Sequence, residues 1–287
     1  MKVRGLWGPV VLAAALVIVT QFYFCGLSGA RTKSRERLSI QGSTTILPIA
    51  QAIAEEYMDL ADRGLLPEMD ITVRGGGSGV GITALLDGTI DIAMASRPIK
   101  PGEIERARKK GFNPVPTIIA KDGIAVIVHP SNSIKGLNIE QLKAIYTGQI
   151  STWSKVGGQD KSIVVISRDT ASGTFETFKK LVLKGEKVRN DALMLASNQA
   201  VATTVAKTPG AIGYVGLGYL SERVKALEID KVEPSQRTVV NGDYKLSRPL
   251  FMYTHGEPKG MTKKFIDFVL SLAGQRVVKD LGFVPLG

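Results

Sequence analysis

Three turns rich in Gly, Ser and Thr, each placed between an apolar strand and a helix, constrain this chain more than any other feature. The turns are residues 42–45, 75–81 and 172–174, and Ser96-Arg97 stands at a fourth strand end. Strands that alternate with helices predict an α/β fold with a mostly parallel sheet. Ligands bind such sheets at the carboxyl ends of the strands. We therefore expect the turns to meet at one place.

The turn at residues 172–174 follows the apolar, β-branched run 163–166 and precedes a helix with Phe175 and Phe178 on its apolar face. Unpaired N–H groups and a positive dipole end are found where a helix begins. Ser172 and Thr174 add hydroxyl groups, and Arg168 adds a guanidinium that suits a tetrahedral oxyanion. This turn predicts a small anion as ligand. When the turn is considered alone, the alternative is an ordinary helix cap beside a surface arginine.

The same periodicity divides the rest of the chain into short elements. The predicted strands are residues 38–40, 69–73, 90–94, 115–119, 123–128, 163–166, 209–215, 224–227 and 248–253. The predicted helices are residues 46–64, 82–86, 103–110, 142–146, 175–182, 199–207 and 261–273. The strand at 123–128 is expected to open a second unit, and a short closing segment is expected after the last helix.

The first thirty residues predict a targeting segment. Lys2 and Arg4 precede an apolar run at 10–24, and residues 28–30 are small, as at a signal-peptide cleavage site. An uncleaved anchor is the alternative, because the apolar run approaches the length that spans a membrane. Cys25, the only cysteine, excludes an internal disulfide, and the bulky residues before it disfavour lipidation. Residues 31–37 are expected to be a basic linker.

The formal net charge is +11, yet Lys and Arg are scattered among Asp and Glu, and only 6% of residues are aromatic. Nucleic acid is therefore not the expected partner, because basic blocks are missing and few aromatic rings are present for base stacking. Catalytic motifs are missing too: no P-loop lysine, dinucleotide fingerprint or nucleophile elbow is present. The isolated His129 and His255 and the single Cys give no zinc spacing. We predict no enzyme, no metal and no cofactor.

Anion binding needs more donors than one helix end supplies. Micromolar affinity requires a net binding free energy of about −8 kcal/mol. The lost rotational and translational freedom of the ligand costs about 4–15 kcal/mol more. Each charge-assisted hydrogen bond returns about 1.5–3 kcal/mol, so on the order of six to ten donors are required. Three helix ends and two arginines could supply them.

These turns, in their order, resemble those of a known family. The matching segments are Gly42-Ser43-Thr44-Thr45, Gly76-Gly77-Ser78-Gly79-Val80-Gly81, Asp91-Ile92-Ala93-Met94-Ala95-Ser96-Arg97, Arg168-x-x-x-Ser172-Gly173-Thr174, Ile212-Gly213-Tyr214-Val215 and Tyr244-x-Leu246-Ser247-Arg248-Pro249-Leu250. Together they resemble the phosphate-binding protein of bacterial phosphate ABC importers, over nearly the whole chain from Leu38 onward.

The resemblance implies a two-lobed, type II periplasmic-binding-protein (venus flytrap) fold with discontinuous lobes. Lobe one would be residues 38–121 and 246–287, and lobe two residues 122–245. It further implies an exported, periplasmic or extracytoplasmic monomer that captures inorganic phosphate and delivers it to an inner-membrane ABC permease. The implied phosphate ligands are Ser43, Thr44, Thr45, Ser78, Ser96, Arg97, Arg168, Ser172, Gly173 and Thr174.

One position departs from a pattern found in some members, which place an Asp after the Ser of the turn at Ser96. This chain has Arg97 there, so the group that accepts the proton of hydrogen phosphate is unassigned, with Asp169 and Glu176 as candidates. Asp169 could instead orient Arg168 through an ion pair. Another oxyanion such as sulfate, or an exported anion-sensing or adhesion module of the same fold, are the alternative functions.

Overall fold

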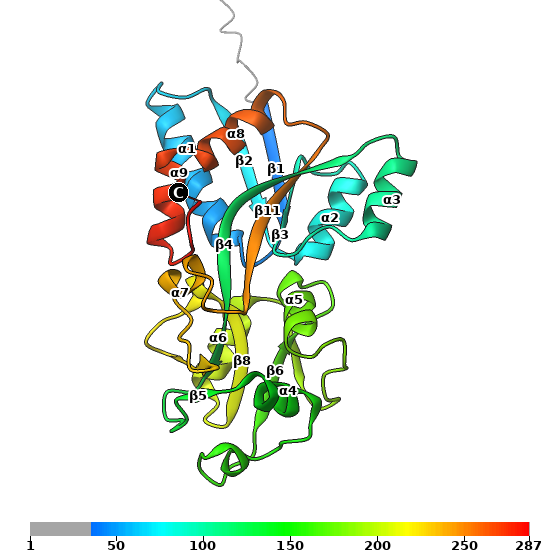
Figure 1. The fold of residues 1–287 in the computed structure, drawn as a ribbon. Coiled ribbons are helices and arrows are strands. Elements are labelled where there is room, and N and C mark those ends of the chain that lie inside the picture. The colour runs from blue at the N-terminus through cyan, green and yellow to red at the C-terminus, as the bar shows by residue number, and fades with distance from the viewer. Residues whose placement is uncertain (1–35, 287) are drawn as a thin grey trace, which may run out of the picture. The chain divides into compact units, whose positions relative to one another are not determined.

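The computed structural model describes residues 36–286, and its first part repeats a strand–helix unit three times (Figure 1). The strands are β1 (Glu36–Gly42), β2 (Met69–Arg74) and β3 (Ile92–Ala95), and the helices that follow them are α1 (Leu47–Asp62), α2 (Ser78–Leu86) and α3 (Pro101–Lys109). β1 lies between β2 and β3 and runs parallel to both. The parallel arrangement predicted from the alternating pattern is confirmed here.

Helix α1 shows why the sequence folds this way. Ile49, Ile53 and Tyr57 recur at helical spacing and are buried on one face. Pro48 lies in the first turn, where a helix needs no backbone N–H donor. The helix packs against the sheet through this apolar face.

Two long antiparallel strands, β4 (Pro114–Val128) and β11 (Ser247–His255), carry the chain between the two halves (Figure 1). The predicted break between strands 115–119 and 123–128 is wrong, because β4 is continuous. β11 pairs with the first part of β4, and β8 (Ala211–Gly216) pairs with the second part. The ladder therefore continues through the joint, where Asp122 lies opposite Arg248.

The other half is built on three parallel strands. β6 (Val164–Arg168) lies between β8 and β7 (Leu193–Leu195) and pairs with both. Its helices are α4 (Ile139–Thr147), α5 (Gly173–Leu181), α6 (Asn198–Lys207) and α7 (Gln236–Val240), with 3₁₀ turns η1 (Trp153–Val156) and η2 (Leu217–Tyr219). The predicted strand at 224–227 is shorter in the structure: β9 (Lys225–Ala226) pairs with β4. A further short strand, β10 (Glu228–Ile229), pairs with β5 (Gly136–Leu137).

Each half has its own apolar core. One core packs β4 from Ile124 onward against β8 and the rings of Tyr146, Phe178 and Tyr214, of which the last two stack at 4.0 Å between centroids. The other packs β1, α1, β11 and the C-terminal helices, and a smaller cluster lies between α2, α3 and the sheet. Two cores joined by β4 and β11 make a two-lobed α/β fold.

The C-terminal segment forms two helices, so the predicted single helix at 261–273 is wrong. α8 (Gly260–Leu270) ends where Ser271 adopts an extended backbone, and α9 (Leu272–Asp280) begins there. Ser271 caps α9, because its Oγ accepts a hydrogen bond from the backbone N–H of Gly274 at 3.3 Å. The Gln275 carboxamide then ties α9 to β4 through the Ile119 carbonyl at 3.0 Å.

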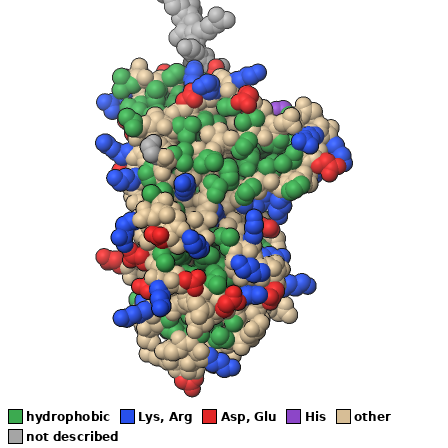
Figure 2. Space-filling view, viewed as in Figure 1, with side chains coloured by type: hydrophobic (Ala, Val, Ile, Leu, Met, Phe, Trp, Pro, Cys, Tyr) green, Lys and Arg blue, Asp and Glu red, His purple; other side chains and the backbone are tan. Residues whose placement is uncertain are grey.

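The predicted leader at residues 1–30 and most of the linker at 31–37 lie outside the described residues. Within residues 36–286, no helix combines the length and the apolar character needed to cross a membrane. On the face shown in Figure 2, Lys and Arg are scattered among Asp and Glu, as the sequence pattern indicates.

A buried ion pair fixes α3 to the end of β3. Arg97 contacts the Glu103 carboxylate with both terminal nitrogens, at 2.7 Å for Nη2–Oε1 and 2.9 Å for Nη1–Oε2. The backbone N–H of Lys100 also donates to Glu103 Oε2, at 2.8 Å, as in an N-terminal capping box. Burial would raise the pKa of Glu103, but the bonds from Arg97 and Lys100 hold it below its usual range.

We expect Glu103→Gln to lower the free energy of unfolding by about 3–5 kcal/mol at neutral pH, because it leaves the Arg97 guanidinium buried without its counter-charge. Since the carboxyl pKa is lowered in the folded state, its stabilisation is present above the unfolded-state pKa and is lost as pH falls through the folded-state pKa. Urea unfolding of variant and wild type should therefore converge in acid.

Glu105→Gln is the matched control, since Glu105 lies on the same helix but its pair with Lys109 is exposed. Its effect should stay below about 1 kcal/mol. Equal effects of the two variants at neutral pH would contradict a structural role for the buried pair.

Candidate functional site

The structure brings the predicted turns together. Ser43, Thr44 and Thr45 follow β1, Ser78 begins α2, and Ser172, Gly173 and Thr174 begin α5. Three contacts join turns that are distant in sequence: Thr45 Oγ1 to Thr174 Oγ1 at 2.9 Å, Ser96 N–H to Ser78 Oγ at 3.0 Å, and Gly79 N–H to the Ala171 carbonyl at 2.9 Å. We use the name polar cluster for the buried polar side chains at these turns and the buried side chains that contact them. The members at the turns are Thr44, Thr45, Ser78, Ser96 and Thr174.

Glycine is required where the turns approach most closely. A Cβ atom on Gly173 would lie 2.3 Å from Ser78 Oγ and 2.7 Å from Ser96 Oγ, so no side chain fits there. Gly77 has φ = +99°, and a Cβ atom on it would lie 2.7 Å from the Ala171 carbonyl oxygen. The turns before α2 and α5 can meet only because these two positions carry no side chain.

Arg168, the last residue of β6, is a cation of the cluster that pairs with no carboxylate in the described part of the chain. Its Nε donates to the Leu195 carbonyl at 3.0 Å, and its Nη2 donates to the Ala196 carbonyl at 2.9 Å and to Thr44 Oγ1 at 3.1 Å. The side chain is 1% exposed, and its Nη1 has no hydrogen-bond partner among residues 36–286. Burial lowers the pKa of Arg168. A buried cationic donor of this kind calls for an anion.

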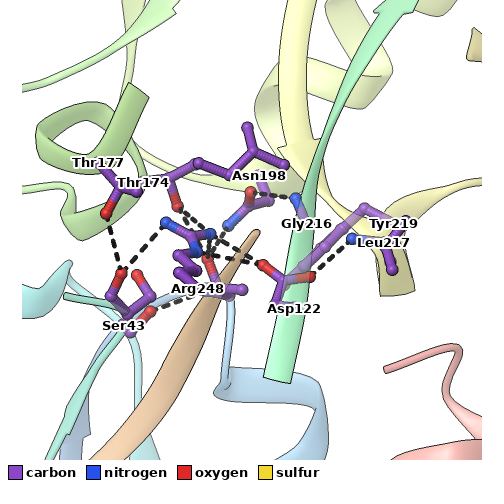
Figure 3. A network of polar contacts seen from close by, with 12 residues as sticks. Ser43, Asp122, Thr174, Thr177, Asn198, Gly216, Leu217, Tyr219 and Arg248 are labelled. Atoms are coloured by element: carbon purple, nitrogen blue, oxygen red, sulfur yellow. Dashed lines mark hydrogen bonds and ion pairs between the residues drawn. The ribbon is translucent and has the colours of Figure 1, made fainter. Parts of the chain in front are cut away.

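A second buried guanidinium, Arg248, was not predicted as part of the site. It lies opposite Asp122 in the pairing of β11 with β4, with Nη2 and Oδ2 3.0 Å apart. Arg248 Nη2 also reaches Thr45 Oγ1 at 3.3 Å and Thr174 Oγ1 at 2.9 Å (Figure 3). Asp122 Oδ1 accepts the N–H of Leu217 at 2.9 Å. Burial raises the pKa of Asp122, and the charge of Arg248 opposes that rise.

Asn198, at the start of α6, was also missed. Its Nδ2 donates to Thr44 Oγ1 and to Thr45 Oγ1, both at 3.1 Å, and its Oδ1 accepts the N–H of Gly216 at 3.2 Å (Figure 3). The Tyr219 hydroxyl donates to the Thr44 carbonyl. The sequence signal was weak, because an Asn at a helix start ordinarily indicates a cap.

Arg97 differs from the other predicted ligands, because its terminal nitrogens are engaged, whereas its buried Nε has no hydrogen-bond partner among residues 36–286. Its two terminal nitrogens are held by Glu103, and Nη1 also donates to the Pro98 carbonyl at 2.9 Å. The two candidate proton acceptors are engaged as well. Asp169 Oδ1 accepts the N–H of Ala171 at 3.0 Å, and Glu176 pairs with Lys100 at 3.1 Å.

The predicted serines Ser43 and Ser172 are buried beside the cluster; Ser43 accepts a hydrogen bond within its own turn, and Ser172 caps α5. Ser43 Oγ accepts the N–H of Thr45, and Ser172 Oγ accepts the N–H of Phe175, both at 3.2 Å. The first N–H groups of α5 have no partner inside the helix and lie at its positive end. In total the cluster holds two guanidinium groups and one carboxylate, so it carries an excess positive charge suited to an anion.

Metal chemistry has no corresponding arrangement in the described part of the chain. No three His, Cys, Asp or Glu side chains within residues 36–286 are grouped so as to hold a metal ion. His129 contacts Ser131, and His255 stacks on Phe112 at 3.6 Å between ring centroids. Both histidines thus have local partners outside the polar cluster.

Known proteins of similar sequence and structure agree with this geometry. Residues 29–272 match a family model described as a PBP superfamily domain. The chain is 32% identical over its whole length to the phosphate-binding protein PstS of Bacillus subtilis, covering 95% of it, and 31% identical over 91% of the chain to PstS of Borreliella burgdorferi, covering 94%.

Solved structures show the same two-lobed fold. A substrate-binding protein of Clostridium perfringens with bound phosphate is 35% identical, with a TM-score of 0.80 over 88% of this chain and 100% of that one. An ABC-type phosphate transport receptor of Vibrio cholerae is 31% identical, with a TM-score of 0.69 over 86% of this chain and 99% of that one. The predicted fold class is confirmed, and the chain belongs to the bacterial phosphate-binding protein family of the PBP superfamily.

Proposed function

We propose that this protein captures inorganic phosphate at the polar cluster and delivers it to an ABC permease in the membrane. The observation that carries the proposal is Arg168: a guanidinium that is 1% exposed, has no carboxylate paired with it in residues 36–286, and keeps Nη1 unpartnered. An anion placed against Nη1 would supply the missing charge and the missing hydrogen bond. Relatives that are named for phosphate binding, including one with bound phosphate, favour phosphate as that anion.

The cluster offers donors on the scale that binding requires. Arg168 Nη1, the hydroxyls and the first N–H groups of α5 can converge on one tetrahedral ion, which suits the six to ten donors estimated roughly from the energetics. The proposed contacts are Ser43, Thr44, Thr45, Ser78, Ser96, Arg168, Ser172, Gly173 and Thr174. Arg97 is not among them because Glu103 holds it.

We further propose that the lobes are residues 38–121 with 246–287, and residues 122–245, and that closing them completes the site. The bond from Gly79 to Ala171 and the ion pair of Lys100 with Glu176 both join these two sets of residues. A bound anion that is contacted from both lobes would stabilise the closed form over the open one.

The setting of the protein follows from the family and the leader. We propose an extracytoplasmic, monomeric binding protein without catalytic activity, exported by residues 1–30, which act as a cleaved signal or remain as an anchor. The relatives are phosphate-binding and ABC transport proteins, which supports the permease as partner.

Arg168→Met tests the site directly. The substitution keeps much of the side-chain length but removes the cation and its donors, so phosphate affinity measured by isothermal titration calorimetry should fall at least about 100-fold. Arg237→Met, which removes an exposed arginine on α7, is the matched control and should bind as wild type does. Normal phosphate binding by a folded Arg168→Met protein would show that the site is elsewhere.

Phosphate should be strongly preferred over sulfate. With the mature protein at neutral pH, we expect calorimetric affinity for phosphate to exceed that for sulfate by about 100-fold or more, as the relatives named for phosphate binding suggest. Such a preference requires an acceptor for the proton of hydrogen phosphate, which sulfate would leave unpaired. Molybdate serves as a larger oxyanion for comparison. Similar affinities for phosphate and sulfate would instead indicate a general oxyanion receptor.

A further inference from the structure

The hydrogen bonds around Thr44 determine where its hydroxyl proton can go. A hydroxyl oxygen has two lone pairs and one proton. Thr44 Oγ1 accepts from Arg168 Nη2 and from Asn198 Nδ2, both at 3.1 Å. Both lone pairs are therefore occupied, and the proton must point toward another acceptor.

Thr45 and Thr174 differ from Thr44 in this count. Arg248 Nη2 carries two protons but lies within hydrogen-bond distance of three acceptors: Thr174 Oγ1 at 2.9 Å, Asp122 Oδ2 at 3.0 Å and Thr45 Oγ1 at 3.3 Å. The 2.9 Å contact between Thr45 and Thr174 can therefore run in either direction. Thr44 is the hydroxyl whose lone pairs are both filled, and its proton has no acceptor in residues 36–286.

Both donors to Thr44 are held in place. The Oδ1 of Asn198 accepts the backbone N–H of Gly216, so a flipped carboxamide would lose that bond and place two N–H donors face to face. Arg168 is held by the carbonyls of Leu195 and Ala196, at 3.0 and 2.9 Å. Asn198 is fully buried, which makes any broken bond costly.

We propose that Asn198 is a positioning residue, which together with Arg168 commits the Thr44 hydroxyl to donate to the bound anion. Asn198 need not touch the ligand, because its Nδ2 fills a lone pair on Thr44 Oγ1 and so turns the hydroxyl proton outward. The inference rests on the phosphate function proposed above and adds the means by which this hydroxyl donor is oriented. Without the Asn198 donor, the Thr44 hydroxyl could rotate and accept instead, and it would then repel an oxyanion.

A double-mutant cycle tests the inference for Asn198. Asn198→Leu has a similar size but no donors, so phosphate affinity by calorimetry should fall about 10-fold. Thr44→Val, which removes the oriented proton, should cost about 10-fold or more. If Asn198 acts through the Thr44 hydroxyl, the double variant should bind almost as well as Thr44→Val alone, because nothing is left to orient.

The Thr44→Ser variant is a second background in which to measure the effect of Asn198→Leu. It keeps the hydroxyl, so Asn198→Leu should again cost about 10-fold there. Gln199→Leu is the matched control, because Gln199 is the next residue of α6 and is exposed, and its Nε2 donates to Thr203 Oγ1 at 3.2 Å, away from the threonines of the polar cluster. The Gln199→Leu variant should bind phosphate as wild type does. Circular dichroism and thermal unfolding would confirm that each protein is folded.

Several results would overturn the proposal. If the two losses of phosphate affinity multiply in the Asn198→Leu/Thr44→Val protein, Asn198 does not act through the Thr44 hydroxyl. A phosphate affinity of Asn198→Leu within threefold of wild type would also contradict the positioning role. If Asn198→Leu does not fold, Asn198→Ala enters the same cycle under the same criteria. Absence of phosphate binding by wild type would reject the proposed function itself, whereas wild-type binding with independent losses would reject the positioning role alone.

Discussion

A guanidinium buried without a counter-charge is the constraint on which the rest of this structure depends. Arg168 is held by the carbonyls of Leu195 and Ala196, which fix two of its nitrogens and leave Nη1 unpartnered within residues 36–286. Burying such a cation is unfavourable unless an anion joins it. The turns, the glycines that let them meet and the hydroxyls around them all make sense as the surroundings of that anion.

The two crossing strands connect this site with the fold. β4 and β11 pair through the joint between the lobes, and their register places Asp122 beside Arg248. That ion pair is buried, and Arg248 contacts Thr45 after β1 and Thr174 at the start of α5. The segments that join the lobes therefore also arrange the hydroxyls that come from each of them, so the position of the lobes and the geometry of the site are coupled.

The sequence predicted the strand-turn-helix units and the meeting of their turns, because periodicity and Gly, Ser and Thr at strand ends are local signals. It did not predict Asn198 or the Asp122–Arg248 pair. Asp122 follows a lysine in a stretch that suggested a break, and only the register with β11 shows its partner. The pairing of Arg97 with Glu103 was not predicted for a similar reason: an arginine at a strand end can face a ligand, and the contact with Glu103 depends on how α3 packs.

Anomalous diffraction from crystals grown with arsenate, a heavier tetrahedral analogue of phosphate, tests the central claim most directly. We predict one strong anomalous peak within hydrogen-bond distance of Arg168 Nη1, in contact with Thr174 and the first N–H groups of α5. A peak bound elsewhere, with Arg168 Nη1 still unpartnered, would contradict it.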